Sequence, residues 1–243
     1  MRLAVCILHY GSPDTTSRLH RQLLEAEPER AGDILVLDNA APLPYPDAWI
    51  RLPHNRYWAG AFAWALDELE STGYTHVWFC NNDMVFVSPS PYMSRAEGRW
   101  SWLERRGRVG MLSPSVTTNP YHAQMKHVPG GECREAAYID GIAPLVSLDC
   151  VRALGGLDCA DNIFGYGVDV WLSCRAARAG WGVWVDHSLV VRHQYHTAAK
   201  QDHAFLSRAA VAEDAYLGKR LGPGWRETLK GLQQTPQETI REP

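Results

Sequence analysis

The stretch "HVWFCNNDMVF", residues 76–86, decides how this chain is interpreted. An apolar run over residues 76–80 ends in Asn81, Asn82 and Asp83, and the chain then turns apolar again. Taken alone, the triplet is a turn, because Asn and Asp hydrogen-bond their own backbone and tolerate left-handed conformations. In open α/β sheets, however, ligands lie beyond the carboxyl ends of the strands. The rest of the chain has to decide between a turn and a binding site.

Apolar runs and helical patterns alternate on both sides of this stretch. Buried strands are predicted at residues 2–8, 33–40, 76–80 and 109–114, with a short strand at 49–53. Helices are predicted at residues 12–27, where Pro28 is a stop, and at residues 58–70. This alternation predicts an α/β fold with a mostly parallel central sheet and helices on both faces.

The second half of the chain is less regular. Its pattern predicts a strand and a short helix over 136–156, a helix over 167–180, a strand pair or one long bent strand over 181–196, and an amphipathic helix over 198–220. We expect one domain over residues 1–220, with a first half at 1–115, a second half at 116–197 and the helix at 198–220. Residues 221–243 are expected to form a polar tail.

Composition excludes several classes of protein. The 243 residues are 46% hydrophobic and 21% charged, with a net charge of −3, so a nucleic-acid polymer is not expected as a partner. No apolar run approaches the roughly 20 residues of a membrane span. The six cysteines form no C-x-x-C pair, which indicates buried free thiols in a reducing compartment. We expect a cytoplasmic protein without a transmembrane segment, for which peripheral contact with the inner face of the membrane stays open.

Three predicted strands end in polar side chains. The first delivers His9 and Tyr10, the second Asp38 and Asn39, and the fourth the triplet 81–83, all at one edge of a parallel sheet. The turn after the first strand lacks G-x-G-x-x-G, and G-x-x-x-x-G-K-[ST] occurs nowhere. The glycine-rich basic loop of a nucleotidyltransferase is missing as well. What remains is a nucleotide site built from side chains and one metal ion.

The order of several motifs carries a family resemblance. The motifs are "VCILHY" (5–10), "VLDNA" (36–40), "NRYWAGAFAWAL" (55–66), "WFCNND" (78–83), "IDGIAPLVS" (139–147), "GGLD" (155–158), "FGYGVDVWLSCRAARAG" (164–180) and "VVRHQYH" (190–196). Together they resemble the family 2 glycosyltransferases of the glycosyltransferase A (Rossmann-like) fold, particularly bacterial rhamnosyltransferase-like members. Each motif alone is weak, but their order and spacing match over about residues 3 to 196.

The resemblance implies a set of donor-binding residues. These are His9, Tyr10, Asp38, Asn39, Arg56, Asn81 and Asn82. A carboxylate at position 38 can accept the imide N–H of uracil or thymine, which favours a uridine or thymidine donor, with guanine still open. The alternative for Asp38 is a strand-end cap. Arg56 is expected to steady the diphosphate or the base, although an exposed arginine is the commoner outcome.

The triplet occupies the position of the family's metal motif. Asp83 matches the metal-binding aspartate, and Asn81 is expected to touch ribose or a metal-bound water. Mn²⁺ or Mg²⁺ fits this site, because hard cations take oxygen ligands and often only one or two carboxylates besides phosphate and water. His193 matches a family histidine that completes the metal site or contacts the diphosphate; an ordinary structural histidine is the alternative.

The acceptor side is implied by the second half of the pattern. The family has Glu-Asp followed two residues later by Asp, whereas this chain has Val168-Asp169-Val170-Trp171. Asp169 is therefore the general-base candidate, with a helix cap as the alternative. Trp171 would stack on an acceptor sugar or fill the core. Asp140 and Gly141 are tentative acceptor-side residues, and Asp158 is expected to be structural.

The resemblance predicts an inverting glycosyltransferase. It would move a sugar from a uridine or thymidine diphospho-sugar to a hydroxyl of a saccharide or lipid-linked acceptor. The missing acids at Val168 and Trp171 keep a second hypothesis open, a non-catalytic module that binds carbohydrate or nucleotide sugar. A sugar-phosphate nucleotidyltransferase is the third hypothesis, disfavoured by the absent basic loop.

Overall fold

The computed structural model describes residues 1–194, 203–234 and 239–240, and within them ten strands form one sheet. The strands are β1 (Leu3–His9), β2 (Ile34–Asp38), β3 (Ile50–Arg51), β4 (His76–Asn81), β5 (Met84–Phe86), β6 (Val109–Val116), β7 (Cys133–Glu135), β8 (Leu145–Ser147), β9 (Gly182–His193) and β10 (Thr239–Ile240). Their order is β10-β7-β9-β6-β8-β4-β1-β2-β3, and β5 pairs with β9.

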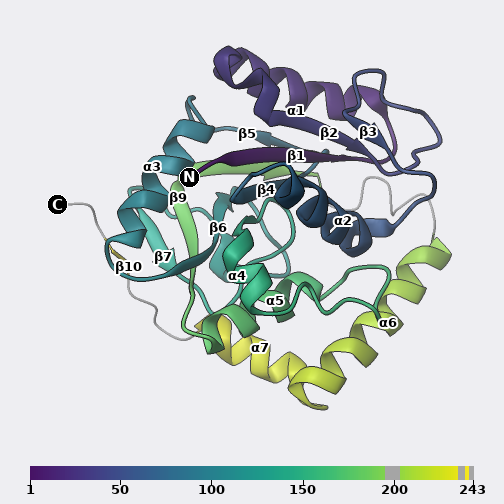
Figure 1. The fold of residues 1–243 in the computed structure, drawn as a ribbon. Coiled ribbons are helices and arrows are strands. Elements are labelled where there is room, and N and C mark those ends of the chain that lie inside the picture. Colours follow the sequence, from purple (N-terminus) through teal and green to yellow (C-terminus); the bar gives the residue numbers. More distant parts are fainter. Residues whose placement is uncertain (195–202, 235–238, 241–243) are drawn as a thin grey trace.

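Helices cover the sheet on both sides (Figure 1). They are α1 (Pro13–Ala26), α2 (Tyr57–Ser71), α3 (Met93–Glu104), α4 (Leu148–Ala153), α5 (Val168–Arg178), α6 (His203–Leu221) and α7 (Trp225–Gln234), with 3-10 turns η1 (Pro28–Asp33) and η2 (Ala123–Met125). In Figure 1, α1 lies above β1 and β2, whereas α2, α4 and α5 lie below the sheet. The predicted α/β architecture is confirmed.

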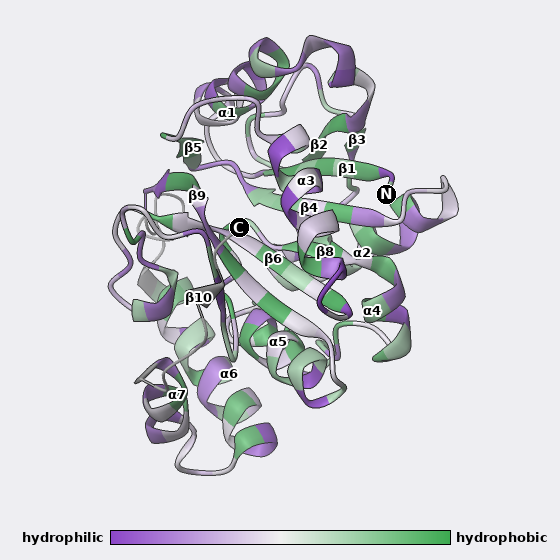
Figure 2. Ribbon diagram, turned by 90° about the vertical axis from the view of Figure 1, so that its left-hand side faces the viewer, coloured by the Kyte–Doolittle hydropathy of each residue, from purple (hydrophilic) through white to green (hydrophobic). Residues whose placement is uncertain are grey.

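The first half of the sheet is parallel. β1 pairs in parallel with β2 and β4, and β3 pairs in parallel with β2. Every residue of β1 is buried, as expected of a strand covered on both faces, and Figure 2 shows it as a hydrophobic ribbon. Beyond β4 the sheet is mixed, because β8 runs antiparallel to both β4 and β6. The expectation of a mostly parallel sheet therefore holds for the first four strands of the chain.

The segment 181–196 contains one long strand. β9 runs parallel to β6 with a register shift between Pro114 and Ser115, so the bend that the sequence left open is an irregularity within one strand. Its far end pairs antiparallel with β5, which sets Met84 opposite His193. The strand pairing thus brings His193 beside Asp83, although the two residues are more than 100 positions apart in the chain.

The predicted polar tail contains a helix. α7 buries Trp225 and Leu229, which lie four residues apart on one helix face, and Gln233 donates to the Tyr138 hydroxyl at 2.6 Å. Strand β10 follows and pairs with β7. The prediction was wrong there, because two apolar residues at helical spacing sufficed to dock a segment that is otherwise polar. The expected boundary near residue 197 falls in 195–202, outside the described residues.

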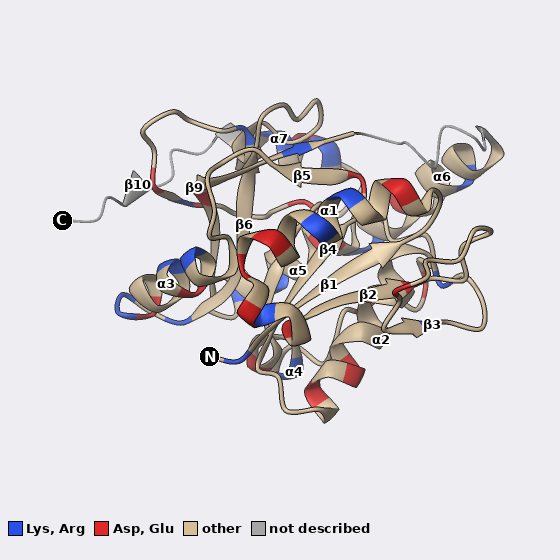
Figure 3. Cartoon of the chain, turned by 90° about the horizontal axis from the view of Figure 1, so that it is seen from above, with Lys and Arg blue, Asp and Glu red and all other residues tan. Residues whose placement is uncertain are grey.

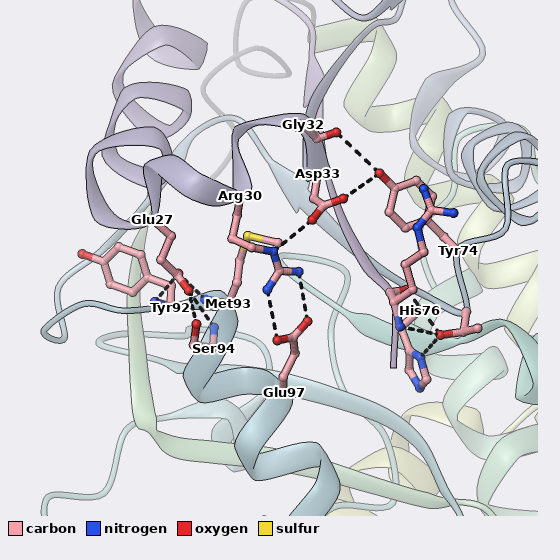
Figure 4. A network of polar contacts seen from close by, with 12 residues as sticks. Glu27, Arg30, Gly32, Asp33, Tyr74, His76, Tyr92, Met93, Ser94 and Glu97 are labelled. Atoms are coloured by element: carbon pink, nitrogen blue, oxygen red, sulfur yellow. Dashed lines mark hydrogen bonds and ion pairs between the residues drawn. The ribbon is translucent and has the colours of Figure 1, made fainter.

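A buried carboxylate joins the end of α1 to the start of α3 (Figure 4). Glu27 is 2% exposed and accepts the backbone N–H groups of Tyr92, Met93 and Ser94, together with the Ser94 hydroxyl. Burial raises the pKa of Glu27, but these four donors outweigh burial and lower the pKa below its usual value. Glu27 therefore acts as the cap of α3 from another segment.

Charged residues lie mainly on the outer helices. Figure 3 shows both signs of charge on α1 and on α3. Arg30 links η1 to α3, because its guanidinium contacts Asp33 of η1 at 2.9 Å and the Glu97 carboxylate of α3 at 3.0 Å. Within the described segments, no helix combines the length and the apolar character that crossing a bilayer requires.

Candidate active site

The site forms where the parallel strands end. The register sets His9 of β1 opposite Asp38 of β2, and Leu8 of β1 opposite Asn81 of β4. The polar clusters therefore share one sheet edge, as the sequence predicts. Thr16 of α1 ties this edge together, because its hydroxyl contacts His9 Nδ1 at 2.6 Å and accepts from Asn82 Nδ2 at 2.8 Å.

Asp83 and His193 meet at this edge. Asp83 Oδ1 lies 2.8 Å from His193 Nε2, and their side chains are 12% and 8% exposed. The backbone repeats the contact, since Gln194 N–H donates to the Asp83 carbonyl at 2.9 Å. The predicted metal pair is thus brought together by the β5–β9 pairing and not by sequence proximity.

The chemistry of this pair fits a divalent cation bound together with a diphosphate. A carboxylate oxygen and an imidazole nitrogen are both ligands for Mn²⁺. In the described residues, no group of three or more His, Cys, Asp or Glu is placed to hold a metal ion. A cation at Asp83 and His193 would therefore take its other ligands from phosphate and water, as Mg²⁺ and similar ions do in phosphate-transfer sites.

Trp58 of α2 connects the triplet to the opposite side of the site. Its indole Nε1–H donates to Asn81 Oδ1 at 3.1 Å. Gly141 packs against the same ring: a Cβ added at Gly141 would lie 2.7 Å from Trp58 Cζ2 and 3.2 Å from Asp169 Oδ2. Position 141 therefore has no room for a side chain. Gly165, at a φ of +98°, lets the loop before α5 approach α2 equally closely.

Asp169 lies in the first turn of α5, half-buried beside Gly141. The pKa of Asp169 is raised to about 7, mainly by burial and also by the nearby Asp140 and Glu213, whereas the N–H groups of Val170 and Gly141 oppose the shift. A carboxylate with a pKa near 7 is matched to general-base work at neutral pH. This property supports a chemical role beside the helix-cap role.

Asp140 is a second carboxylate in the same region. It is 5% exposed, and its Oδ2 accepts from Asn119 Nδ2 at 2.5 Å. Burial raises the pKa of Asp140, while the nearby His122 and His193 lower it. Its two oxygens accept hydrogen bonds from Asn119 and from the Ile142 N–H, so Asp140 holds the backbone around Gly141 in place.

Arg56 and Asn39 form one corner of the site. Asn39 is buried; its Oδ1 accepts the Arg56 N–H at 2.8 Å, and its Nδ2 donates to Asn55 at 2.9 Å. Asn39 thus holds the loop that presents Arg56. Arg56 Nε is buried and has no hydrogen-bond partner within the described chain. An unpaired guanidinium N–H at the sheet edge suits an anionic ligand.

His9 and Asp38, the expected base contacts, are both bonded within the chain. His9 is fully buried, and its second ring nitrogen contacts the Leu43 carbonyl at 2.8 Å. Asp38 is fully buried too, and it accepts from Ala41 N–H at 2.8 Å, Tyr45 N–H at 3.1 Å and Arg51 at 2.6 Å. These contacts fold the loop after β2 back over the strand end. Asp38 is the strand-end cap, and neither side chain is open to a nucleobase.

The remaining donor-side residues divide in the same way. The Asn82 amide nitrogen donates to the Thr16 hydroxyl at 2.8 Å and to the Tyr10 carbonyl at 3.3 Å, so Asn82 orders the turn after β4. The Tyr10 side chain is half-buried at the edge. Asn81, Asp83 and Arg56 are therefore the triplet and loop residues best placed to meet a donor.

Trp171, a tentative acceptor-side residue, is bonded to its own neighbours in the chain. Its indole N–H donates to Asp158 Oδ2 at 2.8 Å, and the Arg178 guanidinium lies 5.3 Å from its ring centre. Trp171 follows Asp169 by two residues, which puts it on another helix face. The expected structural role of Asp158 fits its contacts, since it also pairs with Arg220 of α6 at 2.9 Å.

Sequence reasoning missed several residues that complete the site. Trp58 gives no signal of a site in the sequence, because an indole in an Ala- and Leu-rich helix is typical of a core residue. Tyr166 lies within electrostatic range of Asp83 and Asp169, and burial raises the pKa of its hydroxyl to about 12. Glu213 of α6 is in range of Asp169 as well. Only the position of α6 beside the site shows this.

Comparisons with known proteins are informative about the fold. No protein-family model matches the chain. It is 28% identical over 178 residues to uncharacterized protein Rv1525 of Mycobacterium tuberculosis, across 70% of this chain and 67% of that protein. Uncharacterized protein Mb1552 of Mycobacterium bovis matches to the same extent.

Solved structures decide the fold class. GalNAc-T7 with UDP, GalNAc and Mn²⁺ superposes with a TM-score of 0.65 at 11% identity, over 95% of this chain and 54% of that chain. Mannosyltransferase PcManGT from Pyrobaculum calidifontis, in complex with GDP-Man and Mn²⁺, gives 0.57 at 14% identity, over 95% and 74%. The chain has the glycosyltransferase A fold. S. aureus TarS superposes too, with a TM-score of 0.58 at 12% identity, over 93% of this chain and 44% of that one.

The predicted fold class is thereby confirmed. The chain spans about half the length of the GalNAc-T7 chain, 54%, so it matches the shared fold and not the whole of that protein. Identities of 11% to 14% establish the fold alone. The activity has to be argued from the site.

Proposed function

We propose that this chain is an inverting glycosyltransferase that moves a sugar from a nucleoside diphosphate sugar to a hydroxyl of a saccharide or glycolipid. The observation that carries the proposal is the 2.8 Å contact between Asp83 and His193 at the sheet edge. Asp169 lies in the same site, in contact with Gly141. The Mn²⁺ complexes of GalNAc-T7 and PcManGT, with UDP and GDP-Man, support the same class of donor.

Asp83 and His193 would hold the divalent cation. Bound Mn²⁺ or Mg²⁺ would neutralise charge on the diphosphate as it leaves. Arg56, whose Nε is buried without a partner in the described chain, adds a fixed positive charge beside the same group. Asn81 adds an amide next to Asp83. These residues bind and orient the donor.

Asp169 performs the proton transfer. Its carboxylate takes the proton from the acceptor hydroxyl while that oxygen forms a bond to the anomeric carbon. The bond from the anomeric carbon to the diphosphate breaks at the same time, and the nucleoside diphosphate departs with the electron pair. Attack from the face opposite the leaving group inverts the anomeric configuration. One base suffices, which suits a motif that retains only one of the family's acids.

The nucleobase of the donor is left open. The argument for uridine or thymidine rested on a free Asp38 carboxylate, and that carboxylate is engaged by Ala41, Tyr45 and Arg51. Uridine, thymidine and guanosine diphosphates are therefore all tested. A glycolipid acceptor would bring the enzyme to a membrane surface.

A non-catalytic binding module is the second candidate. The observation that favours it is the motif itself, in which Val168 is buried and Trp171 is bonded to Asp158 where the family has acids. The two candidates differ in turnover. An enzyme hydrolyses its donor slowly in the presence of Mn²⁺ even without an acceptor, whereas a binding module leaves the donor intact.

A thermal-shift screen tests the proposal first. The chain is melted with UDP, dTDP and GDP, each with and without Mn²⁺, and ligand binding to the native state raises the melting temperature. We expect at least one nucleotide to stabilise the protein only when Mn²⁺ is present. Stabilisation by none of the three, with either metal state, would contradict the proposed function.

A further inference from the structure

Trp58 occupies a position that the proposed reaction does not yet explain. It is half-buried at the start of α2, and it is held from the core side by Phe62 and Phe79, at ring-centre distances of 5.2 and 5.8 Å. Its other edge faces the site, where Nε1–H donates to Asn81 Oδ1 at 3.1 Å. An indole fixed on two sides is a rigid hydrogen-bond donor.

The bond to Asn81 has a chemical consequence. A side-chain amide has one oxygen that accepts and one NH₂ group that donates. Trp58 occupies the oxygen, and none of the described residues accepts a hydrogen bond from Asn81 Nδ2. One lone pair of the Asn81 oxygen is thus taken by Trp58, and the hydrogen-bonding group that Asn81 offers a ligand is its NH₂, which donates to a hydroxyl or phosphate oxygen.

The indole also spans the site. A Cβ at Gly141 would lie 2.7 Å from Trp58 Cζ2 and 3.2 Å from Asp169 Oδ2, so ring, glycine and carboxylate follow one another in close contact. Trp58 thereby contacts the triplet at one edge and the wall beside the general base at the other. Trp58 therefore lies between the triplet and the Gly141 backbone that approaches Asp169.

We propose that Trp58 is a positioning residue that turns the Asn81 amide so that its NH₂ group meets an oxygen of the donor nucleotide. The inference rests on the proposed function, because it needs a nucleoside diphosphate at the sheet edge. It assigns Asn81 as a hydrogen-bond donor and leaves the cation to Asp83 and His193. It also gives a role to an indole that composition alone places in the core.

The test compares two tryptophans of the same helix. Trp58→Phe keeps an aromatic ring but removes the N–H. Trp64→Phe is the matched control, because the Trp64 ring packs against Trp49, with 5.9 Å between the ring centres, and not against the triplet. Mn²⁺-dependent binding of UDP, dTDP and GDP is measured by calorimetry for each protein. Because a net hydrogen bond is modest, we expect Trp58→Phe to weaken the tightest nucleotide about 3- to 10-fold and Trp64→Phe by less than about twofold.

A double-mutant cycle shows whether Trp58 acts through Asn81. Asn81→Ala and the Trp58→Phe/Asn81→Ala double variant are measured in the same way, with melting curves to confirm folding. If the amide carries the effect, the double variant binds no more weakly than Asn81→Ala alone. Independent losses that multiply in the double variant would overturn the inference, and so would a Trp58→Phe variant that binds like Trp64→Phe.

The wild type separates the two levels of the argument. Wild-type protein that binds none of the three nucleotides with Mn²⁺ overturns the proposed function together with this inference. Wild-type protein that binds, combined with an unaffected Trp58→Phe variant, overturns only the positioning role of Trp58.

Discussion

Asp169→Asn isolates the proposed general base. Asn keeps the size of the side chain and is itself a good residue at a helix N-terminus, so α5 is expected to fold unchanged. The amide cannot take a proton from the acceptor hydroxyl, and the motif offers no second acid, because Val168 and Trp171 replace the others. Removal of a positioned general base typically costs about 10²- to 10⁴-fold in rate. We expect donor binding to stay at the wild-type level.

The raised pKa of Asp169 adds a pH signature. The base acts only when deprotonated, so the wild-type rate is expected to fall about tenfold per pH unit below a pKa of about 7. Asp169→Asn should lack this limb. The same shift makes the stability depend on pH. Because the pKa of Asp169 is higher in the folded state than the usual 3.8, its contribution to the free energy of unfolding is fully present below pH 3.8 and is lost as the pH rises to about 7. At pH 8 the variant should therefore melt at a higher temperature than wild type, by an amount that corresponds to at most roughly 4 kcal/mol.

The assay is product formation with an acceptor, alongside nucleotide titration of the same variant. Asp149→Asn is the matched control, because Asp149 also lies in the first turn of a helix, α4, but is 75% exposed and bonded to Arg152. The control should keep both the rate and the pH profile. Transfer by Asp169→Asn within a few-fold of wild type, or an unchanged acidic limb, would refute the assignment of Asp169.

Three further changes probe the metal pair, the close approach and the fold. His193→Ala should weaken Mn²⁺-dependent nucleotide binding by about 10-fold or more, measured by calorimetry, and unchanged binding would make His193 structural. Gly141→Ala should reduce donor turnover, because the Cβ added at position 141 would lie 2.7 Å from Trp58, whereas Asp149→Asn should not. Full turnover by Gly141→Ala would show that the Trp58 ring can move to accommodate the Cβ. Glu27→Gln should destabilise the protein by about 1.5–3 kcal/mol in denaturant melts at pH 7. Since the pKa of Glu27 is lowered, this difference should shrink as acid protonates the wild-type carboxyl, and a constant difference would contradict the cap.

Much of the fold was accessible from the sequence, because buried parallel strands are continuous apolar runs and helices repeat at 3.6 residues. The shared edge of β1, β2 and β4 followed from strand direction alone. The contact of Asp83 with His193 followed only from the family resemblance, since the β5–β9 pairing that creates it joins distant segments. Helix α7 was not predicted, because the only sequence pattern that indicates it is a few apolar residues such as Trp225 and Leu229.

The differences between the expected and the observed contacts of the strand-end residues have one physical cause. Strand-end polar residues serve either a ligand or their own loop, and sequence places them without showing which. The Asp38 carboxylate serves its own loop, because it accepts the N–H groups of Ala41 and Tyr45. At Asp83 the neighbouring strand β9 supplies an imidazole, that of His193, as the partner. Trp58 was missed for the converse reason, since an apolar side chain at a site is recognised only by what it touches.

Calorimetric titration of Asp83→Ala against wild type tests the central claim most directly. Each protein is titrated with the nucleoside diphosphate that stabilises wild type best, in the presence of Mn²⁺ and in the presence of a chelator. The account predicts that wild type binds only with Mn²⁺ and that Asp83→Ala, still folded by its melting curve, loses this metal-dependent binding. Undiminished Mn²⁺-dependent binding by Asp83→Ala would contradict the account and would return the triplet at residues 81–83 to an ordinary turn.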